Sequence, residues 1–121
     1  GIDFTARDLQ MKQKQKGLPW EISKSFDGSA PIGEFVNKSD FEDVNNIDFR
    51  LDLNGNTVQQ GNSGDMIYSF DKIIAYVSQF FTLKIGDLIY TGTPAGVGTV
   101  SINDHLQGYI EDKKVLDFKI K

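Results

Sequence analysis

The chain has 121 residues, of which 39% are apolar and 25% charged, and its formal net charge is −4. This length suits one domain with a modest core, and the composition is that of an ordinary globular protein. An acidic chain with scattered lysines gains little from releasing phosphate counterions, and no apolar run approaches the roughly 18–20 residues of a membrane helix, so we expect neither nucleic acid nor membrane as a partner.

Two residue counts limit the possible metal chemistry. Cysteine is absent and His105 is the one histidine, so disulfides, thiolate sites and histidine-rich sites are excluded within this chain. A bound metal would need oxygen ligands, which favours Mg²⁺, Mn²⁺ or Ca²⁺. The chain opens without a secretory leader pattern, and we expect a cytoplasmic protein. It begins at Gly1 instead of Met, which suggests a mature or truncated product.

The N-terminal region predicts one helix followed by a loop. The run Thr5–Asp8 has the form of a capping box, in which the Thr hydroxyl and the Asp carboxylate each accept a backbone N–H of the other residue. A helix of about three turns should follow and end near Lys16, with Gly17 as the residue that closes it. Pro19 then takes the chain off the helical path. Residues 25–33 are rich in turn formers and predict a loop.

Two hairpins are predicted farther along the chain. Apolar residues alternate over Phe49–Leu53 and lead into Asn54-Gly55, which is typical of a type I′ turn with a return strand near Thr57–Gln60. A final hairpin should pair Leu106–Glu111 with Lys114–Ile120. In that last strand three apolar side chains share one face: Leu116, Phe118 and Ile120.

A second helix and a short strand are predicted between the hairpins. Ser69 should cap a helix over Phe70–Phe81, whose apolar residues recur at helical spacing and predict one buried face. These apolar residues are Ile73, Ile74, Val77, Phe80 and Phe81. Residues 87–91 predict a short strand that breaks into the glycine-rich loop Gly92–Gly98. Many short strands with two helices predict a β-rich mixed α+β fold, and helices are too sparse for a doubly wound parallel sheet.

Three polar residues near the first helix have two interpretations. Asp3 precedes the helix, while Arg7 and Gln10 lie one turn apart on one of its faces. They could converge on an anionic ligand, or they could be a solvated helix face with Asp3 and Arg7 as a weak surface ion pair. Spacing alone favours the solvated face.

Other candidate positions are equally open when taken singly. Lys24 lies between Ile22 and Phe26 in a segment that looks buried or turning, and it could donate to a substrate oxyanion, although most lysines are surface residues. The Gly92–Gly98 loop lets the backbone approach a ligand closely and offers the Thr93 hydroxyl, but a tight connection between strands explains it as well. This loop lacks the glycine spacings of nucleotide-binding motifs. His105 is assigned no role.

The order and spacing of five segments resemble the fumarylacetoacetate hydrolase superfamily, and within it the acylpyruvate hydrolases most closely. These segments are Asp3–Gln10 (DFTARDLQ), Lys16–Trp20 (KGLPW), Lys24–Asp27 (KSFD), Tyr76–Ser78 (YVS) and Gly86–Gly98 (GDLIYTGTPAGVG). The resemblance covers nearly the whole chain. It implies a mixed β-sandwich roll with short helices, a homodimer when full length, one carboxylate-bound divalent ion (Mg²⁺, or Mn²⁺ or Ca²⁺) and a small 2-oxo acid as substrate.

The resemblance also assigns roles that spacing did not. The family's later metal-binding Asp falls on Asp3. Its catalytic Arg and Lys fall on Arg7 and Lys24, and its other substrate-binding positions fall on Gln10, Gly92 and Thr93. The family's Glu-x-Glu metal pair, and the His and Glu that act as base, have no counterpart before Asp3. We therefore expect residues 1–121 to be the C-terminal part of a longer single catalytic domain, with little activity of their own.

The implied function is hydrolysis of a C–C bond in acylpyruvate-type 2,4-dioxo acids by the full-length protein. The superfamily also isomerises 2-hydroxyhepta-2,4-diene-1,7-dioate and decarboxylates oxaloacetate, and a shared site does not choose among these reactions. Two alternatives of another class remain, namely a non-catalytic ligand-binding or assembly module, and an inactive proteolytic core.

Overall fold

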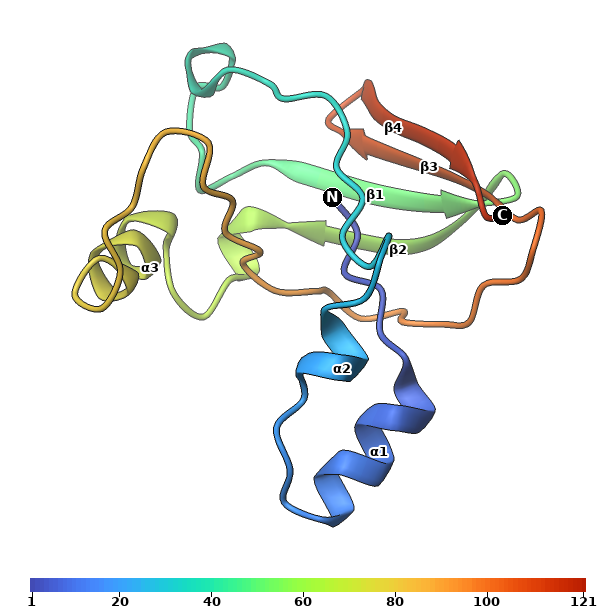
Figure 1. The fold of residues 1–121 in the computed structure, drawn as a ribbon. Coiled ribbons are helices and arrows are strands. Elements are labelled where there is room, and N and C mark those ends of the chain that lie inside the picture. The colour runs from blue at the N-terminus through green and yellow to red at the C-terminus, as the bar shows by residue number, and fades with distance from the viewer. The chain divides into compact units, whose positions relative to one another are not determined.

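The computed structural model describes all residues from 1 to 121, and the chain divides into two compact units, Gly1–Ile32 and Gly33–Lys121. The first unit holds α1 (Arg7–Gln15) and α2 (Glu21–Lys24), and the second holds a sheet, one further α-helix and two short 3₁₀ helices (Figure 1). None of the helices is long and apolar enough to span a bilayer. That residues 1–121 belong to one catalytic domain stays a prediction.

The C-terminal end of α1 is confirmed in detail. Gly17 adopts a left-handed backbone with φ of 64° and donates its N–H to the Lys14 carbonyl at 3.2 Å. The Leu18 N–H donates to the Gln13 carbonyl at 3.0 Å. These two bonds form a Schellman motif, which satisfies carbonyls that the helix leaves open and needs a residue tolerant of positive φ at Gly17.

The N-terminal end of α1 differs from the prediction, since the capping box over Thr5–Asp8 is absent. Ala6 is the N-cap, and no side chain caps the helix. The Thr5 hydroxyl instead accepts a hydrogen bond from the Lys24 ammonium at 2.9 Å. A charged donor forms a stronger hydrogen bond than a neutral amide, so this long-range contact replaces the local one.

The short helix α2 was not predicted, and it changes the surroundings expected for Lys24. Its Ser23 is fully buried and donates its hydroxyl hydrogen to the Trp20 carbonyl at 2.7 Å, which holds the turn together. Ile22 and Phe26 are exposed, which contradicts the buried alternative for the segment around Lys24. The turning alternative is confirmed, because the chain forms one helical turn and then bends. Residues 25–33 contain no helix or strand, which confirms the predicted loop.

The second unit is built on a four-stranded antiparallel sheet in the order β2-β1-β3-β4 (Figure 1). Its strands are β1 (Asp48–Leu53), β2 (Asn56–Asn62), β3 (His105–Ile110) and β4 (Lys113–Lys119). Both predicted hairpins are therefore confirmed, and β1 pairs with β3 to join them. The antiparallel sheet with few short helices confirms the β-rich mixed α+β class.

Local turn chemistry and alternation give the sheet its connections and its core. Asn54 and Gly55 have φ of 51° and 82°, as the predicted type I′ turn requires. The buried apolar side chains of the sheet are Leu106 and Leu116, which come from neighbouring strands. Phe118 is half-buried on the same side of β4 as Leu116, as expected from alternation.

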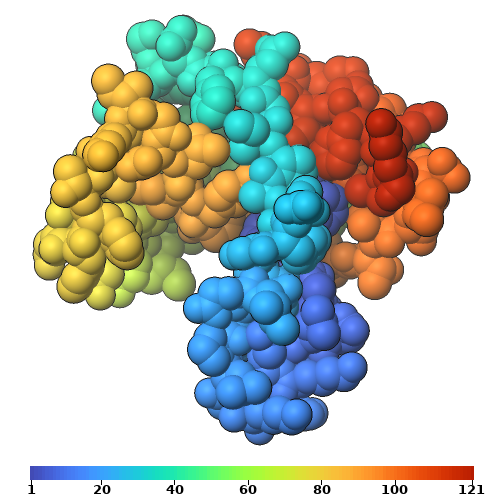
Figure 2. Space-filling model, in the orientation of Figure 1, coloured from blue at the N-terminus to red at the C-terminus, as the bar shows by residue number.

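The helix α3 (Phe70–Val77) begins as predicted but ends one turn early. The Ser69 hydroxyl accepts the Lys72 N–H at 3.5 Å, which is a long N-terminal cap. The predicted buried face is wrong, because no residue of α3 is buried and Ile74 is 48% exposed. Figure 2 shows this region, in yellow, on the outer surface. No strand or helix of the chain packs extensively against it, so helical periodicity alone did not decide burial.

The strand predicted at residues 87–91 is also absent, and this segment is not part of the sheet. Its β-branched and aromatic residues favour an extended backbone, but a strand also requires a hydrogen-bonding neighbour. The η1 (Lys38–Asp40) and η2 (Ser63–Asp65) turns complete the second unit.

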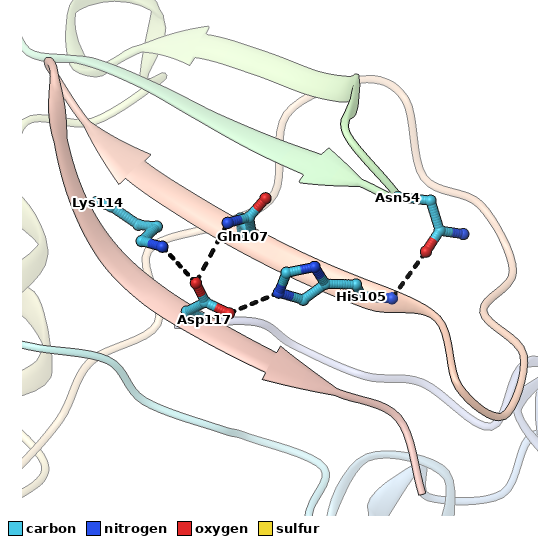
Figure 3. A network of polar contacts seen from close by, with 5 residues as sticks. All are labelled: Asn54, His105, Gln107, Lys114 and Asp117. Carbon is cyan, nitrogen blue, oxygen red and sulfur yellow. Dashed lines mark hydrogen bonds and ion pairs between the residues drawn. The ribbon is translucent and has the colours of Figure 1, made fainter.

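A polar network on β3 and β4 surrounds Asp117 (Figure 3). The carboxylate of Asp117 contacts the His105 Nε2 at 2.6 Å, accepts from the Gln107 Nε2 at 3.2 Å and pairs with the Lys114 ammonium. The hydrogen bonds from His105, Lys114 and Gln107, in that order of importance, hold the pKa of the Asp117 carboxyl well below its ordinary value of 3.8. His105 thus has a structural partner that the sequence did not indicate.

This network predicts acid sensitivity of the second unit. A carboxylate with a lowered pKa in the folded state adds stability above its unfolded-state pKa, and that stability is lost as the pH falls through the folded-state pKa. The free energy of unfolding should therefore decrease below about pH 4, and Asp117→Asn should flatten this decrease. Urea denaturation between pH 2 and 7 measures it. Asp112→Asn, in the β3–β4 turn, is the control, and an equal effect of both variants would contradict the prediction.

Candidate functional site

The extended segment before α1 is fixed to the loop that follows α2. Three backbone N–H groups, at alternate residues Ile2, Phe4 and Ala6, donate to the carbonyls of Pro31, Ser29 and Ser23 at 3.1, 2.8 and 3.0 Å. In an extended chain alternate side chains point the same way, so Asp3 and Thr5 lie on one side of the segment. The backbone pairing thereby places both side chains beside the end of α2.

Lys24, in the last turn of α2, is held between these two side chains. Its ammonium donates to the Asp3 Oδ2 at 2.6 Å and to the Thr5 Oγ1 at 2.9 Å. The side chains of Lys24 and Asp3 are 33% and 35% exposed, so the pair is partly shielded and still reachable from solvent. An ammonium has three N–H donors, and the third is not used by these contacts. The structure therefore joins Asp3 and Lys24, which are 21 residues apart.

Arg7 and Gln10 form a second contact on the exposed side of α1. The Arg7 Nη1 donates to the Gln10 Oε1 at 2.7 Å. This is the i,i+3 pair expected from their spacing, and it orients the guanidinium while leaving most of its N–H groups for a ligand. The expected surface ion pair between Asp3 and Arg7 is wrong, because Asp3 pairs with Lys24 instead. An exposed Arg7–Gln10 pair suits both a solvated face and a ligand-binding face, and the roles of these two residues stay predictions.

The Gly92–Gly98 loop belongs to the second unit and packs against β2. The Gln59 Nε2 donates to the Pro94 carbonyl at 3.2 Å. Gly96 has φ of 94°, and a Cβ there would lie 2.2 Å from the Val58 carbonyl oxygen. The backbone of the loop therefore approaches β2 closely at Gly96, as expected if the loop is a tight connection between strands. Gly92 and Thr93 are exposed beside this anchor, and their convergence with Asp3 and Lys24 stays a prediction.

The donor set of the first unit suits one ligand of an oxygen-bound cation. The contact with Lys24 uses the Asp3 Oδ2, and a carboxylate has a second hard oxygen that can bind a cation. No group of three or more His, Cys, Asp or Glu side chains comes together in a way that could hold a metal ion. Asp3 can therefore contribute to a divalent-cation site, and other oxygen ligands have to complete the coordination.

Thr5 is the site residue that sequence reasoning missed. Its hydroxyl was interpreted as a helix cap, because Thr three residues before an acidic residue is typical of a capping box. The useful signal was the i,i+2 spacing of Asp3 and Thr5 before the helix, which places both side chains on one side of an extended chain.

The chain belongs to the fumarylacetoacetate hydrolase family. Residues 1–121 match the family model described as "Fumarylacetoacetate (FAA) hydrolase C-terminal". Members of this superfamily are enzymes, so the chain is part of an enzyme family that includes hydrolases and tautomerases.

Individual relatives agree in sequence and in fold. The mitochondrial oxaloacetate tautomerase of Bos taurus is 45% identical over 120 residues, covering 99% of this chain and 54% of that protein. A solved structure from Yersinia pestis CO92 has a TM-score of 0.92 at 44% identity, covering 98% of this chain and 56% of the other. Fumarylpyruvate hydrolase from Pseudomonas aeruginosa, in complex with Mn²⁺ and pyruvate, has a TM-score of 0.86 at 36% identity and covers 98% and 52%. The chain spans about half the length of these relatives.

The anchor of the glycine-rich loop can be tested by a matched pair of substitutions. Gly96→Ala forces a side chain into a left-handed backbone and against the Val58 carbonyl, so it should destabilise the second unit by about 2–4 kcal/mol. Gly98→Ala meets no atom within 4 Å and has no positive φ, so it should stay within about 0.5 kcal/mol of the wild type. Thermal or urea denaturation measures both. Equal stability of the two variants would show that the loop is not anchored at Gly96.

Proposed function

We propose that this chain provides the part of a divalent-cation-dependent enzyme that binds the head group of a small 2-oxo acid. The observation that supports it best is the contact of the Lys24 ammonium with the Asp3 carboxylate and the Thr5 hydroxyl. These contacts use two of the three ammonium N–H donors and one of the two carboxylate oxygens. A 2-oxo acid carries a carboxylate and an adjacent keto oxygen. An ammonium donor and a cation held partly by Asp3 complement these two groups.

Two reactions are candidates, and both develop negative charge on the 2-oxo oxygen. Hydrolytic cleavage of a C–C bond in an acylpyruvate-type 2,4-dioxo acid releases a carboxylic acid and pyruvate, and the Mn²⁺–pyruvate complex of the P. aeruginosa hydrolase supports it. Tautomerisation of oxaloacetate moves a proton between C3 and the C2 oxygen. The name of the 45% identical relative supports this reaction, which we place first because the hydrolase is 36% identical.

Each site residue has a defined task in this proposal. A divalent cation, when bound, would supply Lewis acidity to the substrate head group. Asp3 contributes one of its ligands, and Mg²⁺ or Mn²⁺ is the expected ion. Lys24 donates its remaining N–H to the 2-oxo oxygen as the electron pair of the breaking bond moves onto it. Arg7 and Gln10 would bind the substrate carboxylate, and Gly92 and Thr93 are the substrate-binding residues proposed in the second unit.

A homodimer of the intact protein is part of the proposal. Dimers are common among soluble enzymes, and the exposed apolar side chains of α3, such as Ile74 and Tyr76, offer a surface that would gain from burial. The competing class, a non-catalytic module that binds a ligand without converting it, would keep the head-group contacts and show no turnover.

The role of Lys24 can be tested kinetically in the intact protein. Lys24→Met removes the charge at similar length, so kcat/KM should fall by about 10²–10³-fold, as for loss of an oxyanion donor. Oxaloacetate tautomerisation, acylpyruvate cleavage and hydroxymuconate-type isomerisation are followed by absorbance with Mg²⁺ and with Mn²⁺. Lys12→Met on α1 is the matched control and should keep wild-type rates. Wild-type turnover by Lys24→Met would refute the site. Absence of turnover by the wild-type protein would favour the non-catalytic module.

The role of Asp3 can be tested without turnover. Asp3→Asn removes the charge of one proposed ligand, so the Kd for Mn²⁺ should rise by about tenfold or more. Electron paramagnetic resonance of free Mn²⁺ measures this in the intact protein. Asp8→Asn changes the net charge equally on α1 and should leave the Kd unchanged. Equal Mn²⁺ affinity of the wild type and Asp3→Asn would exclude Asp3 from the cation site.

A further inference from the structure

We infer that Thr5 is a positioning residue whose hydroxyl keeps the Lys24 ammonium in the site when the Asp3 carboxylate binds a cation. The inference rests on the proposed roles of Asp3 and Lys24 and adds a third residue to them. It follows from the two acceptors of the ammonium, Asp3 Oδ2 at 2.6 Å and Thr5 Oγ1 at 2.9 Å.

The two acceptors respond differently to a divalent cation. A cation at Asp3 competes with Lys24 for the same carboxylate, and its positive charge also repels the ammonium. A carboxylate is the preferred ligand of a hard cation, whereas the neutral Thr5 hydroxyl is a much weaker one. Binding of the cation would therefore weaken the Asp3 contact and leave the Thr5 contact in place. Without Thr5, Lys24 would have no second acceptor to hold it.

Thr5 is itself firmly placed, which a positioning role requires. The N–H groups of Phe4 and Ala6, on either side of it, are bonded to the carbonyls of Ser29 and Ser23 at 2.8 and 3.0 Å. Its side chain is half-buried, and a β-branched residue has few χ1 rotamers. The hydroxyl is therefore held at a fixed point relative to the end of α2.

A fixed Nζ gives direction to the third N–H of Lys24. With Nζ located by two acceptors, the tetrahedral geometry of the ammonium aims the remaining N–H at one region of space. This N–H is the one that the proposed function assigns to the substrate oxygen. Loss of Thr5 should therefore weaken stabilisation of the transition state more than ground-state binding of the substrate, because the 2-oxo oxygen is most negative in the transition state.

Nuclear magnetic resonance of the Lys24 ammonium tests the inference without any turnover. Hydrogen-bonded ammonium protons exchange slowly enough with water to give an ¹⁵Nζ–¹H signal at low temperature and mildly acidic pH, and exposed ones do not. With saturating Mg²⁺, the intact wild type and Thr5→Ser should show the Lys24 signal, and Thr5→Val should broaden it. Thr82→Val, an exposed threonine in the second unit, is the matched control and should keep it.

The retention role has its own variant pair, which needs no metal. Asp3→Asn weakens the first acceptor, and Thr5 should then preserve the Lys24 signal. Adding Thr5→Val to Asp3→Asn should abolish it. If Asp3→Asn alone removes the signal, Thr5 does not hold Lys24 and the inference is overturned. The Asp3→Asn single variant tests the retention role even if Thr5→Val does not fold.

Kinetics of the intact protein separates positioning from a merely structural role. Thr5→Val should lower kcat by about tenfold with KM changed less than about threefold, and Thr5→Ser should restore most of the rate. Unchanged kcat in Thr5→Val, with wild-type activity present, would overturn the inference alone. Wild-type activity in Lys24→Met would instead overturn the proposed function.

Discussion

The pairing of Lys24 with Asp3 and Thr5 is the interaction on which the interpretation of the first unit depends. It forms because three backbone hydrogen bonds bind residues 2–6 to residues 23–31, which brings together side chains that lie about 20 residues apart. The pair is partly exposed, so solvent screens its charges and it contributes little to the free energy of unfolding. The same exposure keeps it accessible to a ligand. The positions of these side chains are therefore set by the surrounding backbone hydrogen bonds and not by the strength of the ion pair.

Features governed by neighbouring residues in the sequence were predicted well. The type I′ turn at Asn54-Gly55, the left-handed residue Gly17 and the cap at Ser69 each depend on the conformational preference or hydrogen bonding of one or two residues. The hairpins followed because alternation over Phe49–Leu53 continues directly into such a turn. In each case the structure adds no partner that could override the local preference.

Features that need a distant partner could not be read from the sequence. The Thr5 hydroxyl was expected to cap α1, but Lys24 is a stronger donor and arrives from 19 residues away. Residues 87–91 favour an extended backbone, yet no neighbouring strand pairs with them. The apolar residues of α3 have the right periodicity for a buried face, and the chain packs nothing extensive over them. Propensity and periodicity indicate which conformation and which buried face a segment favours, and its tertiary contacts decide whether they form.

The candidate site likewise combines a contact that local spacing explains with one that depends on a distant partner. Spacing alone favoured a solvated helix face for Asp3, Arg7 and Gln10, and only the family resemblance assigned them, together with Lys24, to a site. The structure then separated them into two groups, with Asp3 joined to Lys24 and Arg7 joined to Gln10. The Arg7–Gln10 contact follows from i,i+3 spacing on a helix, whereas no local pattern predicts the contact between Asp3 and Lys24. Thr93 and Gly92 lie in a loop whose conformation is explained by its packing on β2.

In the proposed function, the choice of reaction is limited by which part of the substrate these residues would contact. The proposed carboxylate ligand, ammonium and guanidinium would all contact the 2-oxo acid head group, which oxaloacetate and acylpyruvates have in common. Stabilising charge on the 2-oxo oxygen lowers the barrier to tautomerisation and to C–C cleavage alike, because both pass through an enolate-like arrangement of that group. The reactions differ in what happens at C3 and beyond, where a proton is moved or water attacks a second carbonyl. On this proposal, side chains that contact that part of the substrate would select the reaction, while Asp3, Lys24 and Thr5 would set how well any 2-oxo acid is bound and polarised.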